Sequence, residues 1–132
     1  MTKAAKYHKM IKLSARLQAL ADMVTAGNRV CDMGCDHGYL SIYLVQHQIS
    51  PRVLAMDVGE GPLMRAAAHV CEAELDNYII LRRSDGLKKY RKGEADTLIC
   101  AGMGGPLMRR LLEEEMTKAK SFREMILQPQ SE

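Results

Sequence analysis

The stretch VCDMGCDHGYL (residues 30–40) begins as a short strand, turns through Gly34 and Gly38, and continues as a helix in which Leu40 and Leu44 share one face. A strand, a glycine-rich turn and a helix in this order are typical of α/β domains that bind nucleotides. The turn differs from a dinucleotide-binding loop, because Asp36 stands where such loops usually carry their second glycine.

The rest of the chain repeats the alternation of strands and helices. The sequence predicts strands at 29–33, 52–57, 78–83, 95–101 and 124–128, and helices at 39–48, 62–75 and 106–118, after an amphipathic N-terminal helix at about 8–26. Residues 102–105 are expected to form a loop before the last helix. Apolar strands separated by helices predict a doubly wound parallel sheet of the α/β class, covered on both faces.

Length and composition limit the type of protein. With 132 residues, of which 47% are hydrophobic, the chain can bury one core, which predicts a single domain over residues 1–132 with its α/β core at about 29–132. It contains no run of about 18 apolar residues, and its basic N-terminus lacks the apolar core of a signal peptide, so a cytoplasmic protein with no membrane partner is expected. The sequence does not predict an oligomeric state.

Charge and cysteine usage are less specific. The net charge is +3, and basic residues cluster between Lys3 and Arg16 and between Arg82 and Lys92, which indicates either phosphate-binding patches or solvated faces. The four cysteines show no paired spacing and are predicted to be free thiols. A zinc site made of Cys31, Cys35 and His37 with a distant cysteine is disfavoured, because the spacing matches no familiar zinc module, and no metal is expected.

Polar residues and glycines follow each of the first four predicted strands. Ligands of parallel sheets bind at the carboxyl ends of the strands, where the strand order reverses, so these residues are candidates for one site. They are Asp32, Gly34, Asp36, His37 and Gly38 after the first strand, Asp57 after the second, Ser84, Asp85 and Gly86 after the third, and Ala101 to Gly105 after the fourth. Asp57 is suited to accept hydrogen bonds from ribose hydroxyls, and a turn or helix-cap role is its alternative.

The acidic first turn distinguishes between cofactors. A pyrophosphate binds backbone N–H groups without negative side chains nearby, so Asp32 and Asp36 disfavour NAD and favour a ligand with a cationic end, such as S-adenosyl-L-methionine. The alternative for Asp36 is a cap of the following helix. His37 is suited either to a general base or to a structural role, and no catalytic role is predicted for it.

These motifs resemble those of a known family. DMGCDHGYL (32–40), SDGL (84–87), AGMGG (101–105) and LQPQ (127–130) resemble the bacterial TrmK family, the tRNA (adenine-22, ring nitrogen 1) methyltransferases, and the resemblance runs in order from about Leu13 to Gln130. It implies a Rossmann-like class I S-adenosyl-L-methionine-dependent methyltransferase fold, tRNA as the partner, and a role in tRNA modification and tRNA processing. The chain departs from the family's usual residues at Cys35, Ser41 and Gln130.

The resemblance also implies a role for each matching residue. It implies cofactor contacts for Asp32, Gly34, Asp36, Asp57, Asp85 and Gly86, and a loop facing the target base for Ala101 to Gly105. His37, Ala101, Gly102 and Met103 are candidate cofactor contacts, and Gly104 and Gly105 are candidates for the substrate side. Tyr39 is a candidate stacking surface for the base, with partly buried packing as its alternative. Asp36 would then lie between cofactor and base as the catalytic residue. Methylation of ring nitrogen 1 makes adenine cationic, so a carboxylate near its exocyclic amine would stabilise the transition state. The base must be unpaired to react, since this nitrogen lies on its pairing edge.

Three alternatives stay open at this point. They are a methyltransferase of another RNA or of a small molecule, a cofactor-binding fragment without activity, and a dinucleotide-dependent oxidoreductase. The last is disfavoured because no G-x-G-x-x-G follows the first strand. The family continues beyond the length of this chain with further strands and a helical tail implicated in handling tRNA. The sequence is therefore expected to be a truncated or shortened form that binds tRNA weakly.

Overall fold

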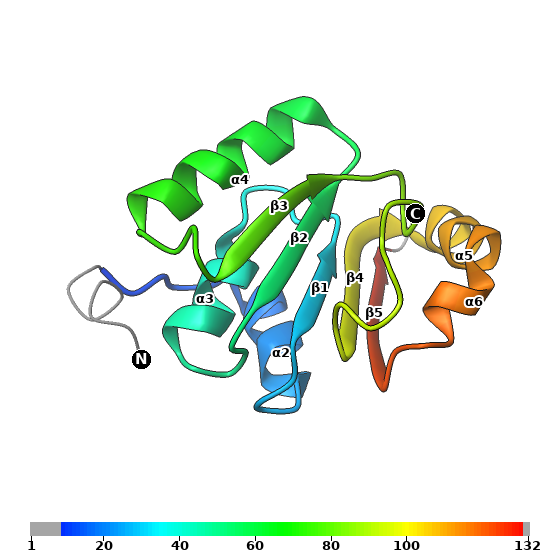
Figure 1. Cartoon of the computed structure of the whole chain (residues 1–132), viewed down its shortest axis with the longest axis horizontal. Helices are drawn as coiled ribbons and strands as arrows, with labels where there is room; N and C mark the ends of the chain where they lie inside the picture. The colour runs from blue at the N-terminus through cyan, green and yellow to red at the C-terminus, as the bar shows by residue number, and fades with distance from the viewer. Residues whose placement is uncertain (1–8, 131–132) are drawn as a thin grey trace.

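Five parallel strands form the sheet, in agreement with the sequence prediction. The computed structural model describes residues 9–130. Its strands are β1 (Val30–Met33), β2 (Val53–Asp57), β3 (Ile79–Arg83), β4 (Thr97–Gly104) and β5 (Glu124–Gln130), and its helices are α2 (Ala15–Met23), α3 (Tyr39–Gln46), α4 (Glu60–Glu72), α5 (Gly105–Glu114) and α6 (Met116–Ala119). The strand order is β3-β2-β1-β4-β5 (Figure 1). The order of the strands therefore reverses between β1 and β4, which is where such sheets bind ligands.

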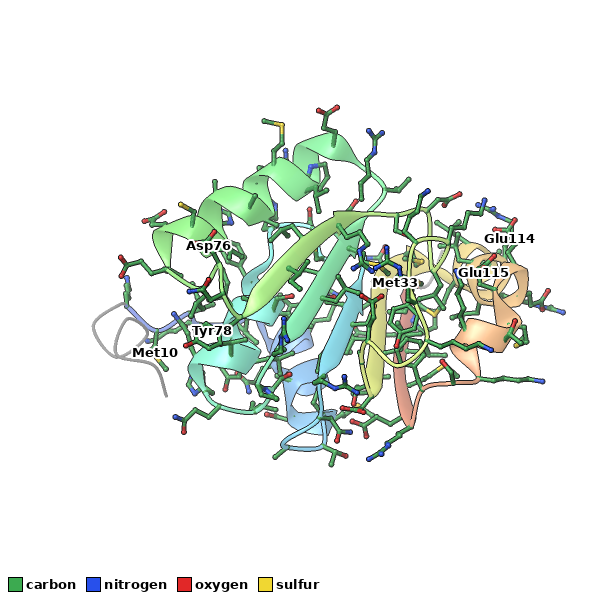
Figure 2. All side chains as sticks on the ribbon, in the orientation of Figure 1. Met10, Met33, Asp76, Tyr78, Glu114 and Glu115 are labelled. Carbon is green, nitrogen blue, oxygen red and sulfur yellow. The ribbon has the colours of Figure 1, made fainter. Side chains whose placement is uncertain are left out.

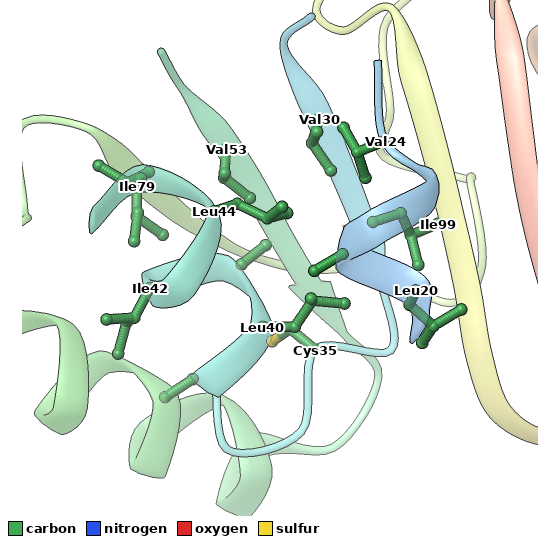
Figure 3. Packing of buried hydrophobic residues seen from close by; sticks show 14 of the residues in the cluster. Leu20, Val24, Val30, Cys35, Leu40, Ile42, Leu44, Val53, Ile79 and Ile99 are labelled. Carbon is green, nitrogen blue, oxygen red and sulfur yellow. The ribbon is translucent and has the colours of Figure 1, made fainter. Parts of the chain in front are cut away.

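Helices cover both faces of the sheet. One face packs against α2, α3 and α4, which bury the strand residues Val30, Val53 and Ile99. The opposite face packs against α5, α6 and the segment 84–96. Figure 3 shows the first of these layers, in which Leu44 of α3 lies beside Val53. Because successive strand residues point to opposite faces and both faces are covered, the central strands read as nearly continuous apolar runs.

The most buried helix is α3, which directly follows the glycine-rich turn. Its residues Leu40, Ser41, Ile42, Leu44, Val45 and Gln46 are all buried. The helix begins after Gly38, whose φ of 80° lies in the left-handed region, and a Cβ at this position would lie 3.1 Å from the Cβ of Ala66 in α4. Glycine is therefore required here both by the turn and by the close approach of α4. No helix within residues 9–130 is long and apolar enough to cross a membrane.

The N-terminal helix is shorter than predicted. We expected it at about 8–26, but α2 spans only Ala15–Met23, and residue 8 lies outside the described residues. Ser14 caps the helix by accepting a hydrogen bond from the N–H of Leu17. Before Ser14 the backbone is held by α3, because Gln46 accepts a bond from the N–H of Ile11 at 2.8 Å and donates to the carbonyl of Lys9 at 3.3 Å. These tertiary bonds replace the first turns of the predicted helix.

The predicted loop at 102–105 is also wrong. Strand β4 continues to Gly104, because its backbone pairs with β5 as far as Gln130. An irregularity between Ala101 and Met103 accommodates Gly102, whose φ is 79°. The helix predicted at 106–118 is divided in two, since Glu115 leaves the helical conformation (φ −132°, ψ 49°) between α5 and α6. Glu114 and Glu115, at this break, are labelled in Figure 2.

Candidate functional site

A cavity of about 600 Å³ lies at the carboxyl ends of the strands. It is lined by every residue that we predicted as a site residue except Gly38, Gly104 and Gly105. Met33, which ends β1 and lies near the middle of the molecule in Figure 2, is part of its wall. The structure thus brings the motifs that follow β1, β2, β3 and β4 together in one site, of the size that small-molecule sites usually have.

The turn between β1 and α3 is held by backbone hydrogen bonds. The N–H groups of Gly34 and Cys35 both donate to the carbonyl of Met56, at 2.8 and 2.9 Å. Asp36 has a φ of 49°, which is uncommon for a residue other than glycine. Its N–H donates to Oδ2 of Asp57 at 3.0 Å, so the end of β2 fixes the tip of the turn.

The carboxylate of Asp36 extends from this fixed backbone into the cavity. Its side chain is 66% exposed and lines the cavity, and its carboxylate lies 3.7 Å from Nε2 of His37. The helix-cap alternative for Asp36 is wrong, because α3 is capped by Gly38 and no hydrogen bond joins the Asp36 carboxylate to an N–H of the described helix. The carboxylate is thus available to a ligand.

Asp32 is the buried carboxylate of the site, with 4% of its surface exposed. Burial raises its pKa to about 6, although the hydroxyl of Ser41 donates to Oδ2 at 2.8 Å and partly opposes this shift. The nearby charges of Asp57 and Asp36 raise the pKa further. A cation bound beside Asp32 would favour its ionised form.

Asp57 closes the turn after β2. Its Oδ1 accepts a bond from the N–H of Gly59 at 2.9 Å, while Oδ2 accepts the bond from Asp36. The turn role that we considered as the alternative for Asp57 is therefore present. Each carboxylate oxygen of Asp57 has a second lone pair and can accept a further hydrogen bond, and the residue lines the cavity.

Two aromatic rings, those of His37 and Tyr39, line one side of the cavity, and a third, His69 of α4, lies beside them. The ring of Tyr39 stacks on that of His69 with centroids 4.8 Å apart, and on that of His37 at 5.7 Å. The Nδ1 of His69 donates to the carbonyl of His37 at 2.7 Å. Tyr39 is partly exposed at 38%. His69 was not predicted as part of this cluster, because its position on α4 depends on how α4 packs against the turn.

The ends of β3 and β4 complete the cavity. Ser84 donates through its hydroxyl to the carbonyl of Gly86, which has a φ of 59° and contacts Leu111 of α5. Asp85 lies 3.3 Å from Lys88, and both side chains are about half exposed. Gly34 lies close to the side chain of Met103, so the turns after β1 and β4 meet. Gly105 lines a neighbouring hollow with Pro106 and Arg109 instead.

Several cavity residues carry no motif and were not predicted as site residues. They are Arg16, Leu17 and Leu20 of α2, Val58 and Pro62 after β2, and Leu107, Arg110 and Leu111 of α5. The amphipathic pattern of α2 was visible in the sequence, but not the side of the sheet on which it packs. A parallel sheet places helices on both faces, and only the packed structure shows which helix borders the ligand site.

The other sequence hypotheses concern charge and metals. In the second basic cluster, Arg82 forms a two-point ion pair with Glu94 at 2.7 and 2.8 Å, so Glu94 neutralises part of the positive charge of the cluster. Of the first cluster, Lys3 and Lys6 lie outside the described residues. All four cysteines are free thiols. Within residues 9–130, no group of three or more His, Cys, Asp or Glu side chains is arranged to hold a metal ion.

Known proteins are similar to this chain in sequence and in fold. Residues 13–132 match the family described as the methyltransferase domain. The chain is 38% identical to a Bacillus subtilis tRNA (adenine(22)-N(1))-methyltransferase over 119 residues, which are 90% of this chain and 50% of that relative. The crystal structure of the B. subtilis m1A22 tRNA methyltransferase TrmK is similar with a TM-score of 0.84 and 37% identity, covering 90% of this chain and 51% of that one.

A second solved structure includes a ligand. It is a putative tRNA (m1A22) methyltransferase of Streptococcus pneumoniae in complex with S-adenosyl-L-methionine, with a TM-score of 0.86 and 35% identity, covering 89% of this chain and 56% of that one. The chain thus spans about half the length of the relatives it matches. These similarities confirm the resemblance and the Rossmann-like methyltransferase fold that the motifs predicted. The chain belongs to the methyltransferase-domain family.

Proposed function

We propose that this chain forms the catalytic domain of an S-adenosyl-L-methionine-dependent methyltransferase that modifies ring nitrogen 1 of adenine 22 in tRNA. The observation that carries the proposal is the set of carboxylates at the ends of β1 and β2, which face a cavity of about 600 Å³. The similarity to tRNA (adenine(22)-N(1))-methyltransferases supports the choice of substrate. A tRNA substrate implies that the reaction takes place in the cytoplasm.

The cavity residues fit S-adenosyl-L-methionine, which supplies an electrophilic methyl group on a sulfonium when bound. Asp32, buried and with a raised pKa, gains a favourable interaction when a positive charge lies beside it. Asp57 retains acceptor capacity for the two ribose hydroxyls. We assign Asp85 and Gly86 to the adenine side of the ligand, and Gly34, His37, Ala101, Gly102 and Met103 to the wall around it.

Asp36 is the catalytic residue in this proposal. Its backbone is held by Asp57 through the N–H of Asp36, its φ is in the left-handed region, and its exposed carboxylate lines the cavity. A carboxylate held there accepts a hydrogen bond from the exocyclic amine of adenine and stabilises the positive charge that develops on the ring. Since the ring nitrogen has a lone pair in the base plane, positioning and this electrostatic interaction supply the catalysis.

The residues around Asp36 hold the target base. The ring of Tyr39, which stacks on His69 and His37 and is partly exposed, offers an aromatic surface to an unpaired adenine. We assign Gly104 and Gly105 to the substrate side beyond the cavity, where β4 passes into α5. The backbone carbonyl of His37 accepts the bond from His69 and so holds the His69 ring beside Tyr39.

Calorimetric titration with S-adenosyl-L-methionine, with NAD as the control ligand, tests the cofactor. We expect saturable binding of S-adenosyl-L-methionine alone, and binding of NAD alone would overturn the proposal. Methyl transfer is then measured in the full-length protein with unmodified tRNA and with a tRNA in which guanine replaces adenine 22. Equal methylation of both tRNAs would show that the site acts elsewhere on RNA, and methylation of neither would reject the proposed substrate.

A further inference from the structure

The cavity contains an uneven set of charges. Of its described lining residues, Asp32, Asp36, Asp57 and Asp85 are acidic, whereas Arg16 and Arg110 are the only arginines or lysines. The amino-acid end of the ligand in the proposed function carries one positive ammonium and one negative carboxylate. Four carboxylates suit the cationic groups, so a negative group requires one of the two arginines.

The two arginines differ in their partners. The guanidinium of Arg110 contacts both oxygens of Glu114, at 3.2 and 3.3 Å, on the exposed side of α5. The guanidinium of Arg16 has no ion pair with a described carboxylate, and its Nη1 donates to the neutral side-chain oxygen of Gln128 at 3.0 Å. Arg16 therefore keeps its full positive charge and most of its donors for a ligand, since a guanidinium has five N–H groups.

The strand order places Arg16 at the correct end of the site. Gln128 of β5 is paired in register with Ala101 of β4, so Arg16 borders the β4 side of the cavity. Asp57 and Asp85 follow β2 and β3, on the other side of β1. Neighbouring strands are about 4.8 Å apart, so β2 and β4 are separated by about 10 Å. A nucleoside whose ribose lies at Asp57 extends its amino-acid end across β1 towards Arg16.

We infer that Arg16 binds the α-carboxylate of the methionine part of the cofactor, and that Gln128 holds its guanidinium in place. The inference rests on the proposed function, because it assumes that the adenosine end lies at Asp57 and Asp85. It makes Arg16 the residue that selects ligands with a carboxylate. The planar guanidinium presents two parallel N–H groups to the two carboxylate oxygens, which a lysine cannot do.

Two ligands that differ only in the carboxylate provide the test. S-adenosyl-L-methionine and its decarboxylated form share the adenosine, the sulfonium and the amine. We expect the unaltered chain to bind the first about 10- to 100-fold more tightly, as hydrogen bonds to a charged group usually contribute. In Arg16→Ala this preference should fall to about twofold or less, while the affinity for the decarboxylated ligand stays the same, which also shows that the variant is folded.

Two further variants complete the experiment. Arg109→Ala removes an arginine of α5 that lies outside this cavity and pairs with Glu113, and it should keep the full preference. Arg110→Ala examines the other arginine of the cavity. If Arg110→Ala loses the preference and Arg16→Ala retains it, the assignment to Arg16 is wrong. Equal losses for both ligands in Arg16→Ala would also overturn it. If the unaltered chain binds neither ligand, the proposed cofactor fails together with this inference.

Discussion

Carboxylates at the two ends of the sheet have different surroundings. At the amino ends of the strands, Asp96 accepts hydrogen bonds from the N–H, Nε and Nη2 of Arg29 at 2.9 to 3.2 Å. At the same end of the sheet, Glu124 accepts hydrogen bonds from Thr25 and Thr97. At the carboxyl ends, Asp32 accepts one bond from Ser41, and Asp36 lies open to the cavity.

The pKa values follow this difference. Hydrogen bonds from Arg29 lower the pKa of Asp96, so that folding favours its ionised form. Burial raises the pKa of Asp32 to about 6, so that folding disfavours its ionised form. The amino-end carboxylates therefore stabilise the fold, whereas the cavity carboxylates are left with acceptor capacity that the protein itself does not satisfy. A ligand is the natural partner for that capacity.

The largest expected effect is that of Asp36→Asn on turnover. The substitution keeps the size of the side chain and a residue type that tolerates a left-handed φ, but it removes the charge. We expect turnover in the full-length protein to fall by about 10²- to 10³-fold, as when a group that stabilises the transition state is lost. The free energy of unfolding should change by less than about 0.5 kcal/mol, because this exposed carboxylate holds no element of the fold.

Asp76→Asn is the matched control for this measurement. Asp76 is also exposed, but it precedes β3 at the opposite end of the sheet and is labelled in Figure 2 away from Met33. It should retain full turnover with tRNA. Full turnover in Asp36→Asn would instead remove Asp36 from the catalytic machinery and leave positioning of the base as the source of catalysis.

The second prediction concerns Asp32→Asn. Asp32 holds its proton up to a pH of about 6 in the folded chain but only to about 4 when unfolded, so raising the pH through this window lowers the stability of the unaltered chain. An asparagine does not ionise, so it does not lose stability in this pH range, and its side-chain oxygen still accepts the hydrogen bond from Ser41. We therefore expect the variant to be more stable by about 1 to 3 kcal/mol at pH 8, with no difference below pH 4.

Urea unfolding at a series of pH values measures this effect. The same variant should bind S-adenosyl-L-methionine at least about tenfold more weakly at pH 8, since a charged partner is lost. Greater stability together with weaker binding would identify Asp32 as a ligand residue retained at the expense of the fold. A variant that is less stable at pH 8 would show instead that the carboxylate supports the fold.

Much of the fold was visible in the sequence, because two local signals agreed. The strands are short apolar runs, and each helix follows a glycine or a polar turn, so the order of elements and the parallel sheet were predicted correctly. The errors occur where distant residues decide the backbone. Hydrogen bonds between Gln46 and the backbone of Lys9 and Ile11 take the place of the first turns of the predicted N-terminal helix. Pairing with β5 as far as Gln130 extends β4 through a glycine-rich segment that was predicted to be a loop.

The candidate site shows the same division. Motifs that directly follow strands were predicted to meet, because the carboxyl ends of parallel strands lie on one edge, and they do meet. Arg16 and His69 come from helices, and no local motif marks them. The place of Arg16 at the cavity and of His69 beside Tyr39 depends on helix packing against the sheet, which amphipathic spacing predicts only as far as the buried side of each helix.

Asp96→Asn tests the amino end of the comparison. It removes the charge that accepts three bonds from Arg29, and we expect a loss of about 1 to 2 kcal/mol at pH 7, moderated because the Arg29 side chain is 41% exposed. The lowered pKa of Asp96 gives the opposite pH dependence to Asp32. The stabilisation by Asp96 is fully present above the pKa that Asp96 has in the unfolded chain, and it is lost as the pH falls through the pKa of Asp96 in the folded chain. The unaltered chain and Asp96→Asn should therefore have the same free energy of unfolding in acid.

Cofactor affinity separates this variant from those of the cavity. Asp96→Asn should bind S-adenosyl-L-methionine as tightly as the unaltered chain when both are fully folded, since Arg29 and Asp96 do not line the cavity. A selective loss of cofactor affinity, at a temperature where the variant is folded, would contradict the view that the amino end serves only the fold.

The smallest effect is expected for Arg109→Ala. Arg109 forms an ion pair with Glu113 at 2.6 Å, as short as any at the amino end, but its side chain is 80% exposed on α5. Water already solvates both charges there, and holding two long side chains together costs entropy that offsets the attraction. The urea midpoint should therefore stay within experimental error in low salt and in high salt. A measurable loss in low salt alone would mean that hydrogen-bond distance, and not the surroundings of the charge, decides which pairs stabilise this fold.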